Sequence, residues 1–445
     1  MTFSPASLLD RLGELETSTN KPERYVIALS GGLDSTVLAA ALAVTREVHG
    51  KALLAVHIDH QLQPESAAWG EHCRDLAAGL DIDFAAERVD VDPNSGSGLE
   101  AAARAARYDA LAAHLRPGDW LLSAHHRDDQ AETLLMNLTR GSGPAGLAGI
   151  GQINPFGRGW LVRPLIDVSR TALEEYAADS KLAWVEDPSN EDRRFDRNYL
   201  RHEILLRLEQ RWPGVTSRLA KSASLAGEAA SLLADLADLD LRSIGDRPER
   251  VNIDGLLALS DARQRNLLRH AIRKAGLPSP PTAQLNAVLL EVVTAKEDAQ
   301  PLVTWPGAEA RRYRGHLYVL PADGDAALAT EPQCLGSSPL ELAHGLGILT
   351  LSPGAAPGLS QAIIEQGLNV RYRKGGEEIQ PVGHAHTRKL KKLLQEEGVV
   401  PWMRERIPLV YSGDELVAVA DLWIAAGAVS SPGTGVHWNG RPALH

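Results

Sequence analysis

The sequence predicts a parallel, doubly wound α/β sheet followed by a mostly helical middle domain. Two patterns carry this prediction. From 25 to 139, short apolar runs rich in β-branched residues alternate with helical stretches, a rhythm typical of a parallel sheet covered by helices on both faces. From 212 to 293, leucine and alanine recur at helical spacing. A stretch of weak periodicity, 323–348, then reads as a linker to a third region at 349–445.

The composition is that of a soluble globular protein with about two to four domains. No apolar run approaches the roughly 20 residues that span a bilayer, and the first 19 residues hold no long apolar core, so we expect neither a membrane partner nor a signal peptide. Cys73 and Cys334 exclude a disulfide framework and a cysteine-rich zinc site, which favours a cytoplasmic location. The net charge of −11 gives no support for general nucleic-acid binding, although local basic clusters can still bind phosphate.

The elements of the first region follow from the apolar runs and the turns between them. The expected strands are 25–30, 53–59, 84–91 and 120–125, and the expected helices are 36–48, 66–78, 99–115 and, after a gap, 169–181. In sheets of this kind, ligands bind beyond the carboxyl ends of the strands. The polar residues that follow each strand are therefore the candidates for chemistry.

A glycine turn after the first strand is the strongest candidate for a phosphate site. It reads Ser30-Gly31-Gly32-Leu33-Asp34-Ser35 and leads into a helix. Free backbone N–H groups and the positive end of the helix dipole would face an anion here. Asp34 would repel phosphate unless Mg²⁺ bridges the two, so we expect Asp34 to bind that ion. The alternative is an ordinary strand–turn–helix with a capping Ser or Asp, but the full string is more specific than that.

Acidic and histidine residues follow the second and fourth strands. Asp129 and Glu132 are three residues apart, so on a helix they share a face and suit a cationic ligand or Mg²⁺. Asp128 is better explained as an acid that complements the helix dipole. His57, after the second strand, is either a polar contact near the nucleotide or a strand-end histidine. The histidines match no zinc signature.

Two further stretches of the first region have both a functional and a structural interpretation. On the alanine-rich helix at 99–115, Arg104 either points a guanidinium at the ATP phosphates or pairs with Glu100 on a solvated face. The glycine-rich segment 140–151 is a lid, a docking loop or a linker.

The segment 184–201 combines a turn with arginines and aromatic residues. Asp187-Pro188-Ser189-Asn190 predicts the turn. The residues expected to contact RNA are Arg194, Arg197, Asn198 and Arg201. Phe195 and Tyr199 lie among them, and phosphate contacts mixed with aromatic stacking are typical of RNA-binding surfaces. The alternative is an amphipathic helix with surface arginines.

The remaining chain predicts helices at 212–245, 262–274 and 282–293, and strands at 308–312 and 316–320 around a hairpin turn. In the first of these helices, the expected core positions are Leu225, Leu232, Leu233 and Leu236. Two basic clusters follow in the third region, and we expect them to bind RNA phosphates. Their members are Arg371, Arg373, Lys374, Arg388, Lys389, Lys391 and Lys392.

These motifs together resemble a known family. The glycine turn resembles the PP-loop of the N-type ATP pyrophosphatases. With 125–133, 184–190 and 194–198 added, the chain resembles the tRNA(Ile)-lysidine synthetases, densely from 25 to 201 and again at 389–410. The resemblance implies the long form of that family: a PP-loop ATPase domain at 1–213, a tRNA-binding middle domain at 214–322, and a small α+β tRNA-binding C-terminal domain at 349–445.

The resemblance also implies a reaction. ATP with Mg²⁺ adenylates C2 of the wobble cytidine in tRNA(Ile) with a CAU anticodon and releases diphosphate. The amine of free L-lysine then displaces AMP to give lysidine. Asp34 would hold the metal, Arg104 would stabilise phosphate charge, and Asp129 with Glu132 would bind lysine.

Two other functions stay open at this point. One is another PP-loop tRNA-modifying enzyme such as a thiolase, although the catalytic cysteine pair common in that chemistry is absent. The other is a non-catalytic module that binds ATP or RNA. A homodimer is among the arrangements that the sequence leaves open.

Overall fold

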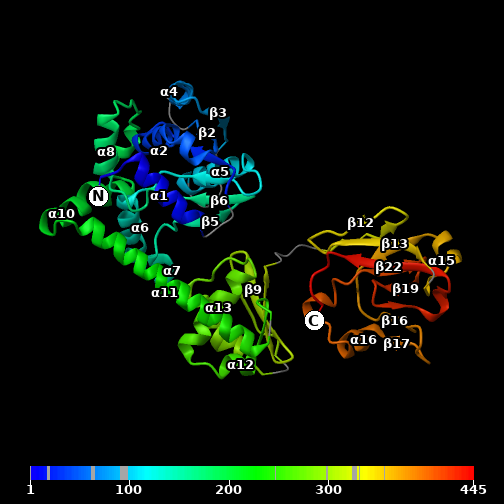
Figure 1. Cartoon of the computed structure of the whole chain (residues 1–445). Coiled ribbons are helices and arrows are strands. Elements are labelled where there is room, and N and C mark those ends of the chain that lie inside the picture. The colour runs from blue at the N-terminus through cyan, green and yellow to red at the C-terminus, as the bar shows by residue number, and fades with distance from the viewer. Residues whose placement is uncertain are drawn as a thin grey trace. The chain divides into compact units, whose positions relative to one another are not determined.

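The computed structural model describes residues 2–17, 21–61, 66–90, 99–245, 247–296, 299–322, 328–329, 331–354 and 356–444. The chain divides into two units, Met1–Leu233 and Ala234–His445, and the long helix α11 (Val215–Ile244) contains the boundary between them (Figure 1). Within the described ranges, no helix combines the length and the apolar character needed to cross a membrane.

The first unit is built on a six-stranded sheet with the order β3-β2-β1-β4-β6-β5. Its strands are β1 (Arg24–Ala28), β2 (Ala52–Asp59), β3 (Asp83–Arg88), β4 (Trp120–Leu122), β5 (Ile153–Phe156) and β6 (Gly159–Val162). All neighbours run parallel except the edge strand β5, which forms an antiparallel hairpin with β6. The four expected strands are confirmed, but the hairpin was not expected. Val91, the last residue of the expected third strand, lies outside the described residues.

Helices cover both faces of this sheet, as the alternation of strand and helix predicts. Alternate residues of β1 pack to opposite sides: Tyr25 and Ile27 join one apolar cluster, whereas Val26 joins another. The first cluster includes leucines of α1 (Pro5–Glu16), α2 (Leu33–Val44) and α8 (Arg170–Asp179), and the second includes Leu111 of α5 (Leu99–Ala113). The doubly wound α/β class is therefore confirmed (Figure 1).

The other helical segments of the first unit are short or irregular. They are α3 (Arg46–His49), α4 (Ser66–Gly79), α6 (Arg127–Thr139), α7 (Pro144–Leu147), a 3-10 turn (Pro188–Glu191), α9 (Asp196–Tyr199), a π-helical turn (Leu200–Leu205) and α10 (Leu206–Arg211). The glycine-rich segment 140–151 contains α7 and is bound to α6 by side-chain amides: Gln130 donates to the carbonyls of Ala148 and Ile150, and Asn137 donates to that of Gly146.

Helix α11 corrects the core positions expected on it. Leu225, Leu232 and Leu233 are 51%, 70% and 38% exposed, whereas Ala237 and Leu241 are buried in the core of the second unit. Helical spacing identifies a stripe of leucines, but a core forms only where other elements lie against that stripe.

The middle of the chain, in the second unit, combines helices with a four-stranded antiparallel sheet. The helices are α12 (Ile253–Leu257), α13 (Asp261–Lys274) and α14 (Thr282–Ala287), which continues as a π-helical turn (Val288–Val293). The sheet has the order β7-β10-β9-β8, from β7 (Arg250–Asn252), β8 (Leu302–Trp305), β9 (Ala308–Tyr313) and β10 (His316–Pro321). The expected helices and the β9–β10 hairpin are confirmed, and β7 and β8 add two strands.

The C-terminal region contains two five-stranded sheets with the orders β11-β15-β18-β19-β20 and β12-β13-β22-β14-β21. Their strands are β11 (Gln333–Leu335), β12 (Leu340–Glu341), β13 (Ile348–Gly354), β14 (Gly358–Leu359), β15 (Leu368–Arg371), β18 (Leu409–Ser412), β19 (Glu415–Val419), β20 (Trp423–Ile424), β21 (Val429–Ser430) and β22 (Gly433–Asn439). A small hairpin, β16 (Glu378–Ile379) with β17 (Arg388–Lys389), leads into α16 (Leu390–Glu396), and α15 spans Gln361–Glu365.

The linker expected at 323–348 needs correction. Residues 323–327 and 330 lie outside the described residues, but β11 pairs with β15 and β12 pairs with β13. Leu335, Leu342 and Leu346 are buried in the C-terminal core. Regular secondary structure in this region therefore begins at about Gln333. Three buried leucines stabilise these short strands, although their sequence shows little periodicity.

Candidate active site

The sheet of the first unit reverses its strand order between β1 and β4, which lie side by side. This is the point at which ligands bind in open α/β sheets, because the connections leave in opposite directions and open a crevice at the carboxyl ends. The glycine turn follows β1, and the His125–Glu132 segment follows β4. The two strongest sequence motifs therefore meet at one edge of the sheet.

The glycine turn is held by its own hydroxyl groups. Ser30 Oγ and Ser35 Oγ are 3.0 Å apart, and Ser35 Oγ donates to the carbonyl of Gly32 at 3.0 Å. Gly31 has a φ of +84°, and a Cβ there would lie 2.9 Å from Cys73 Sγ. Only glycine satisfies both constraints. Cys73 is fully buried beneath the turn, and burial raises the pKa of its thiol to about 12.

The Trp184-to-Asn190 motif lies against this turn, although more than 150 residues separate the two in sequence. The backbone N–H of Val185 donates to the carbonyl of Gly31 at 2.9 Å. Asp187 then accepts from the N–H of Ser189 at 2.8 Å and caps the 3-10 turn, so the expected Asp-Pro-Ser-Asn turn is confirmed. Val185 therefore supports the glycine turn through a backbone hydrogen bond, which no residue pattern in the sequence predicts.

His126 connects the glycine turn to the acidic helix. The imidazole is 1% exposed, and its Nε2 lies 3.6 Å from Asp34 Oδ2 and 3.5 Å from Asp129 Oδ2. On the other side of the ring, Nδ1 accepts from the N–H of Asp128 at 3.2 Å and caps α6. Protonation of Nδ1 would exchange this cap for an ion pair with the Asp128 carboxylate, 3.6 Å away.

The surrounding carboxylates set the charge of His126. Burial alone would lower its pKa, but Asp128, Asp34 and Asp129 outweigh this effect and raise the pKa to about 10. The imidazolium in turn holds the pKa of Asp129 below its usual range against the opposing effect of burial. Sequence reasoning left His126 without a role, since only its position between three acids reveals one.

Asp129 and Glu132 share a face of α6, as expected, but two arginines already contact them. Arg197 donates to Glu132 Oε2 at 2.7 Å and to Asp129 Oδ1 at 3.0 Å. Arg201 donates to both oxygens of Glu132, at 2.6 and 3.1 Å. The Glu132 side chain is 0% exposed, whereas that of Asp129 is 13% exposed. Asp129 is therefore the acid that a ligand can reach.

The π-helical turn explains how both arginines reach the same acids. Arg197 lies on α9 and Arg201 on the π-helical turn that follows, so they occupy neighbouring positions on one helical face. Side chains from two segments 65 to 69 residues apart thus form a four-membered charge cluster. Wide helical turns of this type occur frequently at functional sites.

A second group of cations lies near His125. Arg104 donates to Tyr108 Oη at 3.4 Å, and its guanidinium stacks on the same ring at 5.0 Å. Burial lowers the pKa of His125, and the nearby Arg163, Arg197 and Arg104 lower it further, so the imidazole is neutral at pH 7. Ser123 Oγ lies 2.7 Å from His125 Nδ1. Arg163 is buried. The sequence analysis did not identify it, because the only sign of it in the sequence is a single arginine before a proline.

His57 has a supporting position. It is 5% exposed, its Nδ1 lies 3.0 Å from the carbonyl of Leu29 and 3.4 Å from Cys73 Sγ. The ring therefore holds the end of β1 directly before the glycine turn. Its contact with ATP stays a prediction.

The expected RNA contacts at 194–201 divide into three kinds. Arg197 and Arg201 face the acids described above. Asn198 corrects our expectation: it is 8% exposed, and its amide donates to the carbonyls of Ser189 and Asp192 at 2.9 and 3.0 Å, so it holds the turn together. Arg194 has an 86% exposed side chain that pairs with Asp192. The exposed aromatic rings here are those of Phe195 and Tyr199, at 46% and 49%.

The basic residues of the C-terminal region fall into two groups: arginines that pair with acids and lysines that are exposed. Arg371 pairs with Asp414, Arg373 with Glu377, and Arg388 with Glu396. The Arg373 side chain is only 13% exposed, which corrects its expected role as a free phosphate contact. Within the described ranges, no acid pairs with the exposed side chains of Lys374, Lys389, Lys391 and Lys392.

The residues of the glycine turn fit a magnesium–nucleotide complex. Asp34 Oδ1 is buried and has no hydrogen-bond partner among the described residues, so one carboxylate oxygen is left for a ligand. In the part of the chain that the structure describes, no group of three or more His, Cys, Asp or Glu side chains is arranged to hold a metal by itself. Mg²⁺ typically binds through one or two carboxylates together with substrate phosphates, which is the donor set offered here.

Comparisons with known proteins agree with this division of the chain. Residues 7–208 match the family model of the PP-loop domain, residues 252–318 that of the TilS substrate binding domain, and residues 368–438 that of the TilS substrate C-terminal domain. The tRNA(Ile)-lysidine synthase of Alkalilimnicola ehrlichii is 44% identical over 437 residues, which cover 97% of this chain and 96% of that protein.

Other relatives are similar over comparable lengths. The tRNA(Ile)-lysidine synthase of Methylococcus capsulatus is 40% identical over 421 residues, 93% of this chain and 96% of that protein. The tRNA(Ile)-lysidine synthase of Pectobacterium atrosepticum is 41% identical over 418 residues, 93% of each chain. The similarity therefore extends over all three regions and is not confined to the ATP-binding unit.

Proposed function

The chain belongs to the tRNA(Ile)-lysidine synthase family, and on this premise we propose how its residues perform lysidine formation. It is a ligase that forms a carbon–nitrogen bond on tRNA(Ile). In the proposed reaction, ATP adenylates C2 of the wobble cytidine of the tRNA with a CAU anticodon and releases diphosphate. Free L-lysine then attacks C2 through its side-chain amine, AMP leaves, and lysidine results. Activation by AMP turns a poor leaving group into a good one.

The observation that supports this proposal is the position of His126. One imidazole lies within 3.6 Å of Asp34 in the glycine turn and within 3.5 Å of Asp129 in the acidic helix. A nucleotide site and a site for a cationic amine therefore adjoin each other. A thiolase or a simple ATP-binding module has no need for that second site.

The glycine turn is the proposed ATP site. The N–H groups of Gly31, Gly32 and Leu33, with the hydroxyls of Ser30 and Ser35, face the phosphates, and Asp34 would hold Mg²⁺. An ion held there would neutralise phosphate charge and so make diphosphate a better leaving group. Arg104 is proposed to add a guanidinium from the neighbouring helix.

Asp129 is the proposed contact for the lysine ammonium group, because Glu132 is fully enclosed. Glu132 then acts as a positioning residue that fixes Arg197 and Arg201. We assign these two arginines to the carboxylate of lysine in place of the tRNA phosphates expected from the sequence. Their side chains are 31% and 23% exposed, so we expect that a small carboxylate can still reach them.

The attacking amine must lose a proton before it can act as a nucleophile. Asp129 is the proposed acceptor, as the acid that would contact the ammonium group, whereas burial lowers the pKa of His125 to about 3 and makes that imidazole too weak a base. An imidazolium at His126 cannot take this role, since it already carries its proton.

The tRNA contacts are proposed for exposed groups alone. Near the active site these are Arg194, Phe195 and Tyr199, which offer a phosphate contact and two stacking surfaces. In the C-terminal region they are Lys374, Lys389, Lys391 and Lys392. A cytoplasmic location fits these substrates, and a homodimer stays a prediction that light scattering can test.

Incorporation of radiolabelled lysine into unmodified tRNA(Ile) tests the function. The wild type should label the CAU-anticodon tRNA in the presence of ATP and Mg²⁺ and release one AMP for each lysine. Asp34→Asn should lose activity by two orders of magnitude or more, while Glu174→Gln, an exposed acid remote from the site, should match the wild type. Folded wild-type protein that releases AMP without lysine, or that labels nothing, would overturn the proposal.

A further inference from the structure

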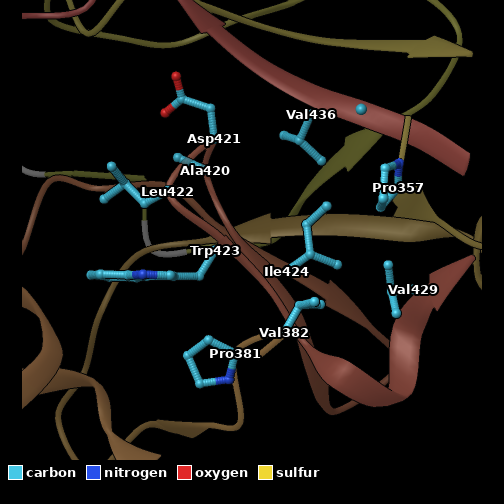
Figure 2. Close-up of a pocket in the computed structure, with 11 residues that line it drawn as sticks. Pro357, Pro381, Val382, Ala420, Asp421, Leu422, Trp423, Ile424, Val429 and Val436 are labelled. Carbon is cyan, nitrogen blue, oxygen red and sulfur yellow. The ribbon is translucent and has the colours of Figure 1, made fainter. Parts of the chain in front are cut away.

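The C-terminal region contains a pocket of about 330 Å³ that lies outside the proposed active site (Figure 2). Its walls come from both five-stranded sheets and from the start of the β16–β17 connection. Ile424 of β20 and Val436 of β22 supply apolar surface, and Pro381 and Trp423 lie at the other side. A volume of this size is at the lower end of the range for small-molecule sites.

Trp423 gives the pocket a stacking surface. Figure 2 shows the indole edge-on, extending from β20 on the side where Leu422 and Pro381 lie. The residue is half-buried because part of its side chain packs against the C-terminal core, and none of the described aromatic rings stacks on the part that stays exposed. A flat apolar face in a pocket of this volume is complementary to a nucleobase, because every base has a π-face and aromatic side chains bind it with little sequence preference.

Asp421 is the only ionisable side chain in the lining of this pocket, as far as the described residues show. One of its oxygens, Oδ1, accepts from Arg441, and none of the described residues is seen to donate to Oδ2. A carboxylate oxygen accepts hydrogen bonds from the exocyclic amine of a base. Adenine, cytosine and guanine carry such an amine, whereas uracil does not.

The rim of the pocket is continuous with the basic surface of this region. Val382 donates to the carbonyl of Ile424 at 3.0 Å, and Ala426 donates to that of Gln380 at 2.8 Å, so residues 380–382 line the edge of β20. Two residues before Pro381, Ile379 pairs with Arg388, and Glu378 pairs with Lys389. Lys391 and Lys392 follow on α16.

Charge distinguishes a nucleic acid from other occupants. The segment 371–392 holds seven lysine and arginine residues in a chain whose net charge is −11. Its three arginines pair with acids, and its four lysines are exposed with no acid partner among the described residues. An apolar peptide or a second copy of this acidic chain would gain little binding energy from such a basic rim. A nucleotide whose base fills the pocket can instead place its own phosphate, or a neighbouring one, on these side chains.

We propose that this pocket binds one unpaired, amine-bearing base of the substrate tRNA, stacked on Trp423 and hydrogen-bonded to Asp421. This inference rests on the proposed function, because it identifies the polyanion as the substrate RNA. It adds a base-specific contact to a region whose basic residues are proposed to contact phosphates without regard to sequence.

Binding of unmodified tRNA(Ile) to the full-length protein, measured by filter retention, tests the proposal. Trp423→Ala should weaken binding by about 5- to 150-fold, the range that follows from loss of one base–aromatic stack. Trp423→Phe, which keeps an aromatic face, should recover most of the affinity. Trp212→Ala removes another exposed tryptophan, 52% exposed, and should bind like the wild type.

Two further measurements separate a binding role from a structural one. Ultraviolet cross-linking of the wild type to tRNA should yield a peptide that contains Trp423. In competition with tRNA, oligoadenylate should displace it more strongly than oligouridylate, and Trp423→Ala or Asp421→Asn should remove this difference.

The proposal is overturned if Trp423→Ala binds tRNA within twofold of the wild type, if Trp423→Phe is as weak as the alanine variant, or if no cross-link reaches Trp423. A change in molecular mass caused by Trp423→Ala would instead indicate an interface between copies and would also overturn it. A wild type that binds tRNA through Trp423 but forms no lysidine would refute the proposed function and leave the base pocket standing.

Discussion

His126 supplies the positive charge that balances the carboxylates around it in the site. A single buried imidazole faces Asp34, Asp128 and Asp129, each within 3.6 Å. Three carboxylates this close would repel one another strongly without a cation between them. The imidazolium therefore allows Asp34, the proposed metal ligand, and Asp129, the proposed contact for the amine, to be adjacent while both stay ionised.

The charge of His126 can be measured directly by NMR. In a metal-free sample labelled at the histidine rings, one imidazole should stay protonated above pH 8 and titrate near pH 10, and this resonance should be missing in His126→Asn. Since the folded-state pKa is raised, the stability it contributes is complete below about pH 6.5 and is lost as the pH rises towards 10. This loss amounts to at most about 1.4 kcal/mol for each pH unit. A spectrum in which every imidazole is neutral at pH 8 would contradict the assignment.

At the scale of elements, helix α6 and the segment formed by α9 and the π-helical turn depend on each other. The two segments are joined by Arg197 and Arg201, whose guanidinium groups meet the enclosed carboxylate of Glu132. Removing the charge of Glu132 leaves Asp129 as the one remaining acid of the cluster for two partly buried arginines, which costs more than loss of an exposed ion pair.

Glu132→Gln tests this dependence with almost no change in side-chain volume. It should lower stability by about 3 to 5 kcal/mol, or roughly 6 to 20 °C in calorimetry, and should raise the KM for lysine without changing the KM for ATP. Glu174→Gln removes an exposed glutamate paired with Arg170 at 3.0 Å and should shift the transition by only a degree or two. Equal shifts in the two variants would show that the cluster around Glu132 is not a buried network.

At the scale of the whole molecule, an acidic chain must bind an acidic substrate. The net charge is −11, so association depends on local clusters of unpaired cations. The structure reduces the expected basic residues of the C-terminal region to four exposed lysines, because Arg371, Arg373 and Arg388 are engaged by acids.

The salt dependence of tRNA binding tests this reduced set. In the triple variant with Lys389, Lys391 and Lys392 replaced by alanine, the slope of log K against log salt should become shallower by about 2 to 3, since each lost phosphate contact contributes about 0.7 to 0.9. A variant with Lys21 and Lys221 replaced, two exposed lysines outside this cluster, should keep the wild-type slope. An unchanged slope in the triple variant would remove these lysines from the tRNA surface.

The sequence by itself determined the features that depend on local patterns. The Ser30–Ser35 turn and the pairing of Asp129 with Glu132 on one face follow from spacing within a few residues. The parallel sheet follows from the alternation of apolar strands with helices, because each element must bury its apolar face.

The tertiary structure decided everything that depends on contacts between distant segments. It placed Val185 against Gly31, enclosed Glu132 between Arg197 and Arg201, and centred His126 among three acids. It also exposed Leu232 of α11, although its spacing matches that of a core position. The physical reason is that a charge or an apolar side chain acquires its role from the partners that reach it, and in each of these contacts at least one partner lies tens of residues away along the chain, as Asp34 does from His126.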